Sequence, residues 1–199
     1  MDTRSLTQLS IDEFLDRLAS DSPTPGGGSA AALAGALAAA LGRMACALTV
    51  SKPKFAAVEA QVRAAAQRLE RAEQMLRRLI DEDAAAYAEL SDAFELDRTN
   101  PQRPERVRQA ATLAAEVPLE TAAVCRRVSQ ELQDLQRAAN PNLRSDVEAA
   151  THLAWAALHA AAANVRVNLP LLDPQAANVV REQLEALVQG RSASQGPCG

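Results

Sequence analysis

Aromatic residues are scarce in this chain of 199 residues: Phe, Trp and Tyr make up 3% of it, although 48% of the residues are hydrophobic. Much of the apolar content is Ala and Leu, which are strong helix formers. No segment shows the apolar–polar alternation of a half-buried strand, and no β-α-β alternation occurs. We therefore expect an all-α fold, an up-and-down bundle with long antiparallel helices. The length fits a single domain over residues 1–190, followed by a flexible Gly/Ser-rich tail at 191–199.

An excess of positive charge is also lacking, because the net charge is -4 and acidic and basic residues are interspersed. No sustained basic face is available for a phosphate backbone, so nucleic acid is not an expected partner. The Arg-rich stretch at 63–78 is interrupted by Glu70 and Glu73. This pattern favours a solvated helix face.

Cysteine pairs and targeting segments are absent as well. Cys46, Cys125 and Cys198 form no CxxC motif, which is typical of reduced cysteines in a cytosolic protein. The N-terminus lacks the basic region and apolar stretch of a signal peptide. The apolar run at 30–50 carries Arg43 and favours a buried helix over a membrane span. We expect a cytoplasmic protein without a membrane partner.

Signatures of metal and nucleotide sites are missing too. The chain has no zinc signature, no nucleophile elbow and no GxxxxGK[ST] sequence. His152 and His159 are seven residues apart, not the four that place two ligands on adjacent helical turns, and Glu148 precedes His152 by one turn. We expect a surface ion pair between Glu148 and His152. No metal and no tightly bound cofactor are expected.

Capping and breaking residues predict six helical segments. Ser10 and Glu13 form a capping box for a short helix that ends near Ser20. Ser145 and Glu148 form a second box for a helix that ends near Asn168. The other expected helices run from Gly28 or Ser29 to Ser51, from Pro53 to Leu96, from Pro104 to Ala139 with a kink or break at Pro118, and from Asp173 to Val188.

A glycine triplet precedes the second helix in "SPTPGGGSAAALAGALAAALG", residues 22–42. The free backbone N–H groups of Gly26 to Ser29 are suited to bind a phosphate or carboxylate at the start of the helix. Without a preceding strand, the glycines equally fit a tight turn in which backbones touch. Lys52, at the far end of this helix, is either a point charge for a ligand or an ordinary C-terminal cation.

A carboxylate interrupts the inward face of the long helix, where Val62, Leu69, Leu76 and Leu90 follow a seven-residue series and Asp83 takes the remaining place. Burial of a carboxylate is costly unless it is paired or lies in a polar pocket. Asp83 therefore marks either a functional site, with Tyr87 one turn further on, or a pair with a buried Arg. Asp81 projects to roughly the opposite side.

Two amides, Asn164 and Asn168, lie one turn apart on the small-residue face of the helix that starts near Ser145. They predict hydrogen bonds inside the bundle, made either to a ligand or between helices.

Several segments together resemble the cyclodeaminase/cyclohydrolase family of folate enzymes: "PTPGGGSAAALAGALAAAL", "LIDEDAAAY", "AAEVPL" and "NPNLRSDVEAATHLAWAALHAAAANVRVNL". The resemblance extends from about Ile11 to Asp173. It implies an all-helical, homodimeric fold. It also implies catalytic roles for Asp83 and Asp81, without naming the general base, and substrate-binding roles for Gly26, Gly27, Gly28, Ser29, Lys52, Asn140, Asn142, Asp146, Asn164 and Asn168.

The activity implied by the resemblance acts on tetrahydrofolate substituted at N5 or N10. Formimidoyltetrahydrofolate cyclodeaminase, which closes the ring to 5,10-methenyltetrahydrofolate and releases ammonia, is slightly favoured. Methenyltetrahydrofolate cyclohydrolase, which gives 10-formyltetrahydrofolate, is the alternative. A non-catalytic helical folate-binding or scaffold protein is the third. A separate formiminotransferase is an expected partner, and the anionic glutamate tail of folate, single or extended, suits the glycine loop and Lys52.

Overall fold

The computed structural model describes residues 4–190, so Cys198 and the tail predicted at 191–199 lie outside the described residues. Every regular element of residues 4–190 is a helix, which confirms the all-α prediction. The α-helices are α1 (Ile11–Leu18), α2 (Gly27–Val50), α3 (Glu59–Glu95), α4 (Arg103–Ala138), α5 (Arg144–Asn168) and α6 (Pro174–Gln189). The short 3-10 helices are η1 (Leu6–Gln8), η2 (Pro53–Val58), η3 (Pro141–Leu143) and η4 (Leu169–Leu171).

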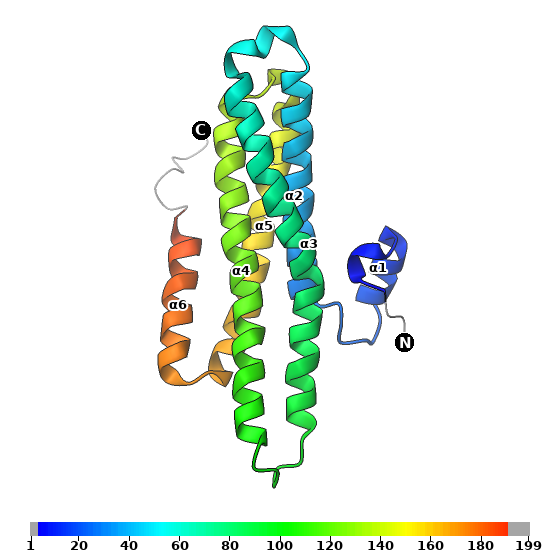
Figure 1. The fold of residues 1–199 in the computed structure, drawn as a ribbon, viewed down its shortest axis with the longest axis vertical. Coiled ribbons are helices and arrows are strands. Elements are labelled where there is room, and N and C mark those ends of the chain that lie inside the picture. Colours follow the sequence, from blue (N-terminus) through cyan, green and yellow to red (C-terminus); the bar gives the residue numbers. More distant parts are fainter. Residues whose placement is uncertain (1–3, 191–199) are drawn as a thin grey trace, which may run out of the picture.

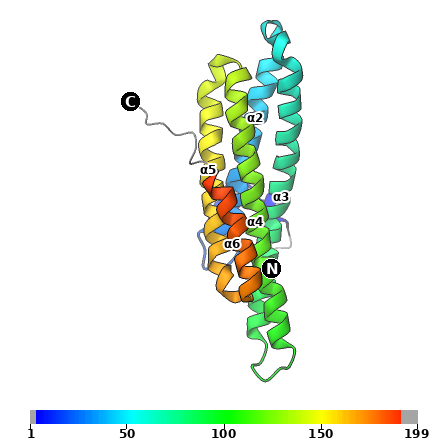
Figure 2. The same cartoon turned by 90° about the vertical axis from the view of Figure 1, so that its left-hand side faces the viewer.

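The four long helices α2 to α5 form an up-and-down bundle (Figure 1). Each packs mainly against its two neighbours in the ring, so α2 contacts α3 and α5, and α4 contacts the same two helices. Helices α3 and α4 extend beyond the start of α2, and α6 runs along the outside of α4 and α5 (Figures 1 and 2). The first residues of α2 therefore lie beside the middle of α3.

The core combines large side chains on α3, α4 and α5 with small residues on α2. Leu69, Leu76, Leu132 and Leu158 are fully buried, which confirms the predicted inward face of the long helix. A Cβ atom on Gly35 of α2 would lie 2.6 Å from the Cys125 sulfur. The glycines and alanines of α2 thus allow its backbone to approach α3 and α4 closely.

Helix α1 stands to the side of the bundle, next to α2 and α3 (Figure 1). Its capping box is formed as predicted: the Glu13 backbone N–H donates to Ser10 Oγ at 3.2 Å, and the Ser10 N–H donates to Glu13 Oε2 at 2.7 Å. Phe14 is the buried residue of this short helix.

The N-cap of α2 is Gly26, two or three residues before the predicted caps Gly28 and Ser29, and no side chain caps the helix. Gly28 and Ser29 instead lie within the first turn. At the other end, the predicted long helix starts at Glu59, since the segment from Pro53 to Val58 forms the 3-10 helix η2. Lys52, just before Pro53, is extended, as a residue before proline prefers.

Pro118 does not interrupt α4, which is continuous from Arg103 to Ala138. Because proline has no N–H, the carbonyl of Ala114 loses its intrahelical partner. The Nδ2 group of Asn168, on α5, donates to this carbonyl at 2.7 Å. A side chain of a neighbouring helix thereby replaces the missing backbone donor and allows the helix to continue.

The second predicted capping box is wrong, because α5 begins at Arg144 with Leu143 as its N-cap and Ser145 lies inside the first turn. The Asn140 side chain accepts a hydrogen bond from the Asn142 N–H and starts the turn η3, which leads directly into α5. The last helix follows its prediction, since Asp173 Oδ1 accepts the N–H groups of Gln175 and Ala176.

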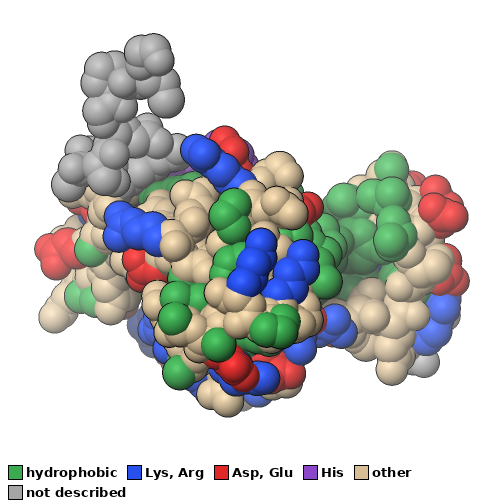
Figure 3. Space-filling view, turned by 90° about the horizontal axis from the view of Figure 1, so that it is seen from above, with side chains coloured by type: hydrophobic (Ala, Val, Ile, Leu, Met, Phe, Trp, Pro, Cys, Tyr) green, Lys and Arg blue, Asp and Glu red, His purple; other side chains and the backbone are tan. Residues whose placement is uncertain are grey.

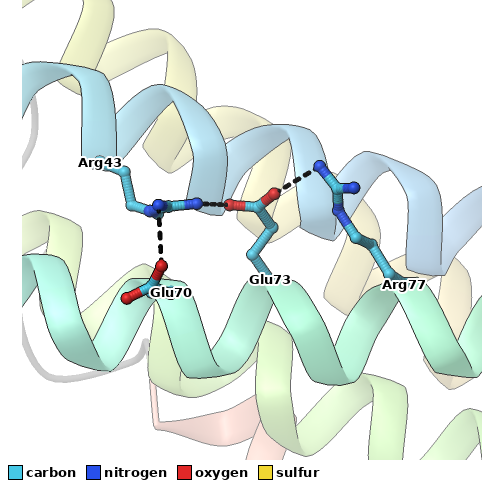
Figure 4. Close-up of polar contacts among 4 residues, drawn as sticks. All are labelled: Arg43, Glu70, Glu73 and Arg77. Atoms are coloured by element: carbon cyan, nitrogen blue, oxygen red, sulfur yellow. Dashed lines mark hydrogen bonds and ion pairs between the residues drawn. The ribbon is translucent and has the colours of Figure 1, made fainter.

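The Arg-rich stretch is not a fully solvated face, because Glu73 on α3 is buried, with 5% of its surface exposed. It lies between two guanidinium groups: Arg43 Nη1, from α2, is 2.5 Å from Glu73 Oε2, and Arg77 Nη2 is 2.7 Å from Oε1 (Figure 4). Glu70 binds the second terminal nitrogen of Arg43 at 3.0 Å. The ion pairs of Arg43 with Glu70 and Glu73 thus link α2 to α3.

The predicted surface pair of Glu148 and His152 is present at 3.9 Å, as an ion pair when the histidine is protonated.

Candidate functional site

The start of α2 holds the carboxylate of Asp83 from α3. The backbone N–H of Ser29 donates to Asp83 Oδ2 at 2.7 Å. Ser29 Oγ lies 2.9 Å from the same oxygen and 2.9 Å from the carbonyl of Ile80, and its single proton is donated to one of them at a time. Because Ser29 is fully buried, these bonds fix the carboxylate against the N-terminus of the helix.

Gly28 and Gly27 leave the space that two polar side chains occupy. A Cβ atom on Gly28 would overlap Asp83 Oδ1, and one on Gly27 would lie 3.1 Å from Asn164 Nδ2. The triplet is therefore a close-approach turn, one of the two interpretations left open by the sequence. The backbone N–H groups of Gly27 and Gly28 have no hydrogen-bond partner within residues 4–190, so binding of an anion by these groups stays a prediction.

Burial raises the pKa of the Asp83 carboxyl above its ordinary value, and the two hydrogen bonds from Ser29 oppose this shift with a smaller effect. In the part of the chain that the structure describes, no Arg or Lys pairs with Asp83, so the alternative of a buried ion pair is not observed. A half-buried carboxyl with a raised pKa is suited to accept and return a proton.

Asn164 and Asn168 differ in what their amides can still bind. Asn164 donates to the Ala160 carbonyl at 2.9 Å and lies beside Gly27. Asn168 uses its amide protons on the carbonyls of Ala114 and Asn164, at 2.7 and 3.1 Å. The Asn168 amide thus has the inter-helix role that the sequence left open, and its use for a ligand stays a prediction.

Tyr87 lies one turn after Asp83 on α3 and is 48% exposed. Its ring is therefore open to solvent next to the carboxylate, because residues four apart share a helix face.

Asp81 does not join the group around Asp83. Its Oδ1 accepts the Leu6 N–H and its Oδ2 accepts the Ser5 hydroxyl, both at 2.6 Å. The carboxylate thereby attaches the segment before α1 to α3. A catalytic role for Asp81 stays a prediction, and the observed contacts are structural.

Four other predicted site residues lie at the opposite end of α2: Lys52, Asn140, Asn142 and Asp146. The 24 residues of α2 span about 36 Å at about 1.5 Å per residue, which separates this group from Asp83. The buried Asn140 donates its backbone N–H to Thr49 Oγ1 at 3.0 Å and so joins η3 to the end of α2. Lys52 is exposed.

The sequence interpretation missed Thr49 and the partner of Asn168. Thr49 is a buried hydroxyl near the end of a helix that is otherwise nearly all apolar, and this contrast could have marked it. The sequence predicts Pro118 as a helix breaker, but it does not show that Asn168 donates to the Ala114 carbonyl, which Pro118 leaves unpaired. Among residues 4–190 no group of three or more His, Cys, Asp or Glu side chains could hold a metal ion.

Comparisons with known proteins agree with the fold and with the resemblance. The profile of the formiminotransferase-cyclodeaminase family matches residues 10–186. Methenyltetrahydrofolate cyclohydrolase from Methylorubrum extorquens is 38% identical over 183 residues, which cover 89% of this chain and 88% of that protein. Formimidoyltransferase-cyclodeaminase from Rattus norvegicus is 28% identical over 94% of this chain, which spans 35% of the relative's length.

A solved structure of similar size shows the same fold. The crystal structure of formiminotetrahydrofolate cyclodeaminase from Thermotoga maritima has a TM-score of 0.80 and 28% sequence identity, over 92% of this chain and 94% of that one. Both the sequence profile and the three-dimensional fold extend over most of the described residues. The chain therefore belongs to the formiminotransferase-cyclodeaminase family.

Proposed function

We propose that this protein catalyses a reaction at the one-carbon bridge between N5 and N10 of tetrahydrofolate, with Asp83 as the group that transfers the proton. The observation that carries the proposal is the Asp83 carboxylate at the glycine-rich start of α2, bonded to Ser29 and without a basic partner in residues 4–190. The relatives that act on this bridge, by their names, support the choice of substrate.

Hydrolysis of 5,10-methenyltetrahydrofolate is our first choice, because the cyclohydrolase relative is 38% identical and similar in length. Water adds to the methenyl carbon while Asp83 accepts one of its protons. The bond from this carbon to N5 then breaks, and N5 receives the proton from Asp83. The remaining hydroxyl proton is released to solvent as the carbonyl forms, and the formyl group stays on N10. The cationic substrate favours an anionic neighbour, and this role suits a carboxylate in a partly desolvated site.

Ring closure with loss of ammonia, which the sequence slightly favoured, is the second candidate. The similarity to the Thermotoga maritima cyclodeaminase supports it. N10 attacks the carbon of the protonated formimino group on N5, Asp83 takes the proton of N10 and passes it to the departing NH2 nitrogen, and ammonia leaves. Both reactions pass through a tetrahedral carbon between N5 and N10, so the same carboxylate serves either one.

The binding groups proposed around Asp83 are the N–H groups of Gly27 and Gly28 and the amide of Asn164. Donors at the start of a helix suit an anionic or carbonyl oxygen. We also propose that the chain acts as a homodimer in the cytoplasm, and that a separate domain or chain transfers any formimino group to N5. Lys52 and the residues of η3 lie too far from Asp83 to contribute within one subunit.

Ultraviolet absorbance of the methenyl group tests the proposal. The purified chain is incubated with 5,10-methenyltetrahydrofolate in one cuvette and with 5-formimidoyltetrahydrofolate in another, each beside a buffer blank. A faster fall of absorbance in the first supports hydrolysis, and a rise in the second with ammonia release supports ring closure. No change in either would contradict catalysis and favour the folate-binding or scaffold alternative.

A further inference from the structure

The two oxygens of the Asp83 carboxylate have different surroundings. Oδ2 accepts the backbone N–H of Ser29 at 2.7 Å and lies 2.9 Å from the Ser29 hydroxyl. Oδ1 has no hydrogen-bond donor within residues 4–190. In the same part of the chain the buried side-chain oxygen without a partner is Ser129 Oγ, so Oδ1, which also lacks one, is not fully buried. One oxygen is therefore held inside the protein, and the other is in contact with solvent.

The Ser29 hydroxyl lies between two acceptors. Its Oγ is 2.9 Å from Asp83 Oδ2 and 2.9 Å from the Ile80 carbonyl, and Ser29 is fully buried. A hydroxyl has a single proton to donate. Ile80 lies within α3, where each carbonyl also accepts the N–H group four residues further on. Rotation of the hydroxyl toward Asp83 therefore leaves no buried carbonyl unpaired.

The charge of Asp83 decides which acceptor receives the hydroxyl proton. A hydrogen bond to an ionised oxygen is roughly twice as strong as one between neutral groups, so the hydroxyl donates to Oδ2 when Asp83 is ionised. When Asp83 is protonated, Oδ2 and the Ile80 carbonyl are both neutral acceptors, and the preference for Oδ2 is lost. Because the backbone N–H of Ser29 donates to Oδ2, the proton of Asp83 binds Oδ1.

Charged side chains do not compete for Asp83, which makes no ion pair within residues 4–190. Residues 27–33 of α2 contain no titratable side chain, and the buried residues of α4 and α5 carry no charge. On α3 the titratable neighbours are Asp81, which is bonded to the segment before α1, the exposed Glu82, and Tyr87. Figure 3 shows Lys and Arg side chains on the end of the bundle that carries η2, at the other end of α2.

We propose that Ser29 is a positioning residue for proton transfer by Asp83. Its buried hydroxyl donates to Oδ2 while Asp83 is ionised, and it is shared with the Ile80 carbonyl again when the proton returns. Oδ1 is the oxygen that exchanges this proton with the substrate. Ser29 keeps its own proton throughout, so one proton moves between Asp83 and the substrate. The inference deepens the proposed function and rests on it for the substrate, while the bonds around Asp83 do not depend on catalysis.

This role differs from the substrate-binding role that the resemblance implies for Ser29. A fully buried side chain has no surface for a substrate, whereas Oδ1 of Asp83 is in contact with solvent. Burial raises the pKa of the Asp83 carboxyl, and the Ser29 hydroxyl, followed by the Ser29 N–H, opposes this shift. The hydroxyl therefore limits how tightly Asp83 holds its proton, because a hydrogen bond to the charged form favours that form.

Carbon-13 NMR of the Asp side chains tests the hydroxyl bond without reference to activity. The Asp83 carboxyl resonance is assigned by its absence in Asp83→Asn and is followed as pH changes. Ser29→Ala is expected to raise the titration midpoint by about one pH unit, because the ionised carboxylate loses one hydrogen bond. Ser29→Cys, whose thiol is a weaker donor, is expected to give a midpoint between those of the wild type and Ser29→Ala.

Ser129→Ala is the matched control for this titration. It removes a buried hydroxyl that has no hydrogen-bond partner within residues 4–190, and it is expected to keep the wild-type midpoint of Asp83. Circular dichroism checks that each variant is folded. An unchanged midpoint in Ser29→Ala, or an equal shift in Ser129→Ala, would overturn the proposal.

The Ile80 carbonyl reports the rotation of the hydroxyl. Its carbon-13 resonance in the wild type is expected to change with the same midpoint as the Asp83 carboxyl, since the carbonyl loses the hydroxyl bond as Asp83 ionises. The change is expected to be absent from Ser29→Ala, which has no hydroxyl to turn, and the same change there would assign it to the charge of Asp83 alone. A wild-type Ile80 resonance that does not follow Asp83 would overturn the rotation even if neither Ser29 variant folds.

The pH dependence of turnover separates positioning from substrate binding. kcat and KM are measured with the folate substrate that the wild type converts, against a buffer blank at each pH. Ser29→Ala is expected to move the acidic limb of kcat to higher pH by the same amount as the NMR midpoint, with KM within about two-fold of wild type. The loss of kcat is then about 10-fold on the acidic side, since one pH unit corresponds to a factor of about ten.

The failures of the two proposals are distinguishable. A raised KM with an unmoved acidic limb would assign Ser29 to substrate binding and overturn its positioning role. An inactive wild type would contradict the proposed function, and the NMR titrations would still decide whether the Ser29 hydroxyl follows the charge of Asp83.

Discussion

Asp83 and Ser29 are joined by a backbone hydrogen bond of 2.7 Å between the middle of α3 and the first turn of α2. The Ser29 hydroxyl lies 2.9 Å from the same carboxylate oxygen. The carboxylate thus takes the place of a capping side chain, although it comes from another helix, and the positive end of the α2 dipole faces it. One oxygen is held in this way, and the other, Oδ1, lies next to Gly28.

Gly28→Ala is expected to lower turnover by at least about 100-fold, a usual effect of displacing a catalytic proton donor or acceptor. The added methyl group would overlap Asp83 Oδ1 and move the carboxylate. Gly26→Ala is the control, since its Cβ would meet only the Pro23 carbonyl, at 3.6 Å. Steady-state rates for both variants check the prediction, and equal rates would contradict the role of Gly28.

The Asp83→Asn variant is expected to gain stability over the wild type as pH rises. The raised pKa of Asp83 means that the folded state binds the proton more tightly than the unfolded state, in which Asp titrates near about 3.9. The wild-type free energy of unfolding therefore falls as pH rises from that value through the folded-state pKa and then levels off. Urea unfolding of both proteins across this range checks the prediction. A difference independent of pH would contradict it.

The helical architecture could be predicted from the sequence because its signals are local. Ala-rich composition, the series Val62, Leu69 and Leu76, and the N-cap Asp173 depend on neighbours along the chain. The start of α5 was missed because the turn begun by Asn140 overrides the Ser145 capping box. The burial of Glu73 depends on Arg43 of another helix, which no local pattern reveals.

Part of the site was predictable for the same reason. The inward direction of Asp83 follows from the seven-residue series, and the structure places it against Gly28 and Ser29. The distance between Asp83 and Lys52 was not predictable. The resemblance to the family assigns both residues to the site but does not state how far apart they lie within one subunit.

Asn168→Ala is expected to destabilise the fold by about 1 to 3 kcal/mol, the usual effect of leaving a buried polar group unpaired. The group is the Ala114 carbonyl, which Pro118 deprives of a backbone donor. Pro118→Ala restores that N–H. Asn168→Ala is therefore expected to destabilise the Pro118→Ala variant less than it destabilises the wild type. Chemical unfolding of the two single variants and the double variant measures this coupling. The same loss in both backgrounds would contradict the explanation.

Glu73→Gln is expected to destabilise the fold by about 1 to 3 kcal/mol, because a buried acceptor of two guanidinium groups loses its charge. Its partners Arg43 and Arg77 are more exposed, which limits the effect. Glu70→Gln is the control: this half-exposed residue binds only Arg43, and solvent-accessible pairs contribute about 0 to 1 kcal/mol. Thermal unfolding of the wild type and both variants, in low and high salt, compares the two losses of stability. A larger loss for Glu70→Gln would contradict the assignment.

The turnover of Asp83→Asn tests the central claim most directly. Asparagine keeps the shape of the side chain and an oxygen that can accept the Ser29 N–H, but it cannot take up a proton. Methenyl absorbance is followed with both folate substrates, and circular dichroism and sedimentation show that folding and assembly are unchanged. We predict a loss of about 100-fold to 10,000-fold in the reaction that the wild type catalyses. Turnover within a few-fold of wild type would contradict Asp83 as the proton-transfer group.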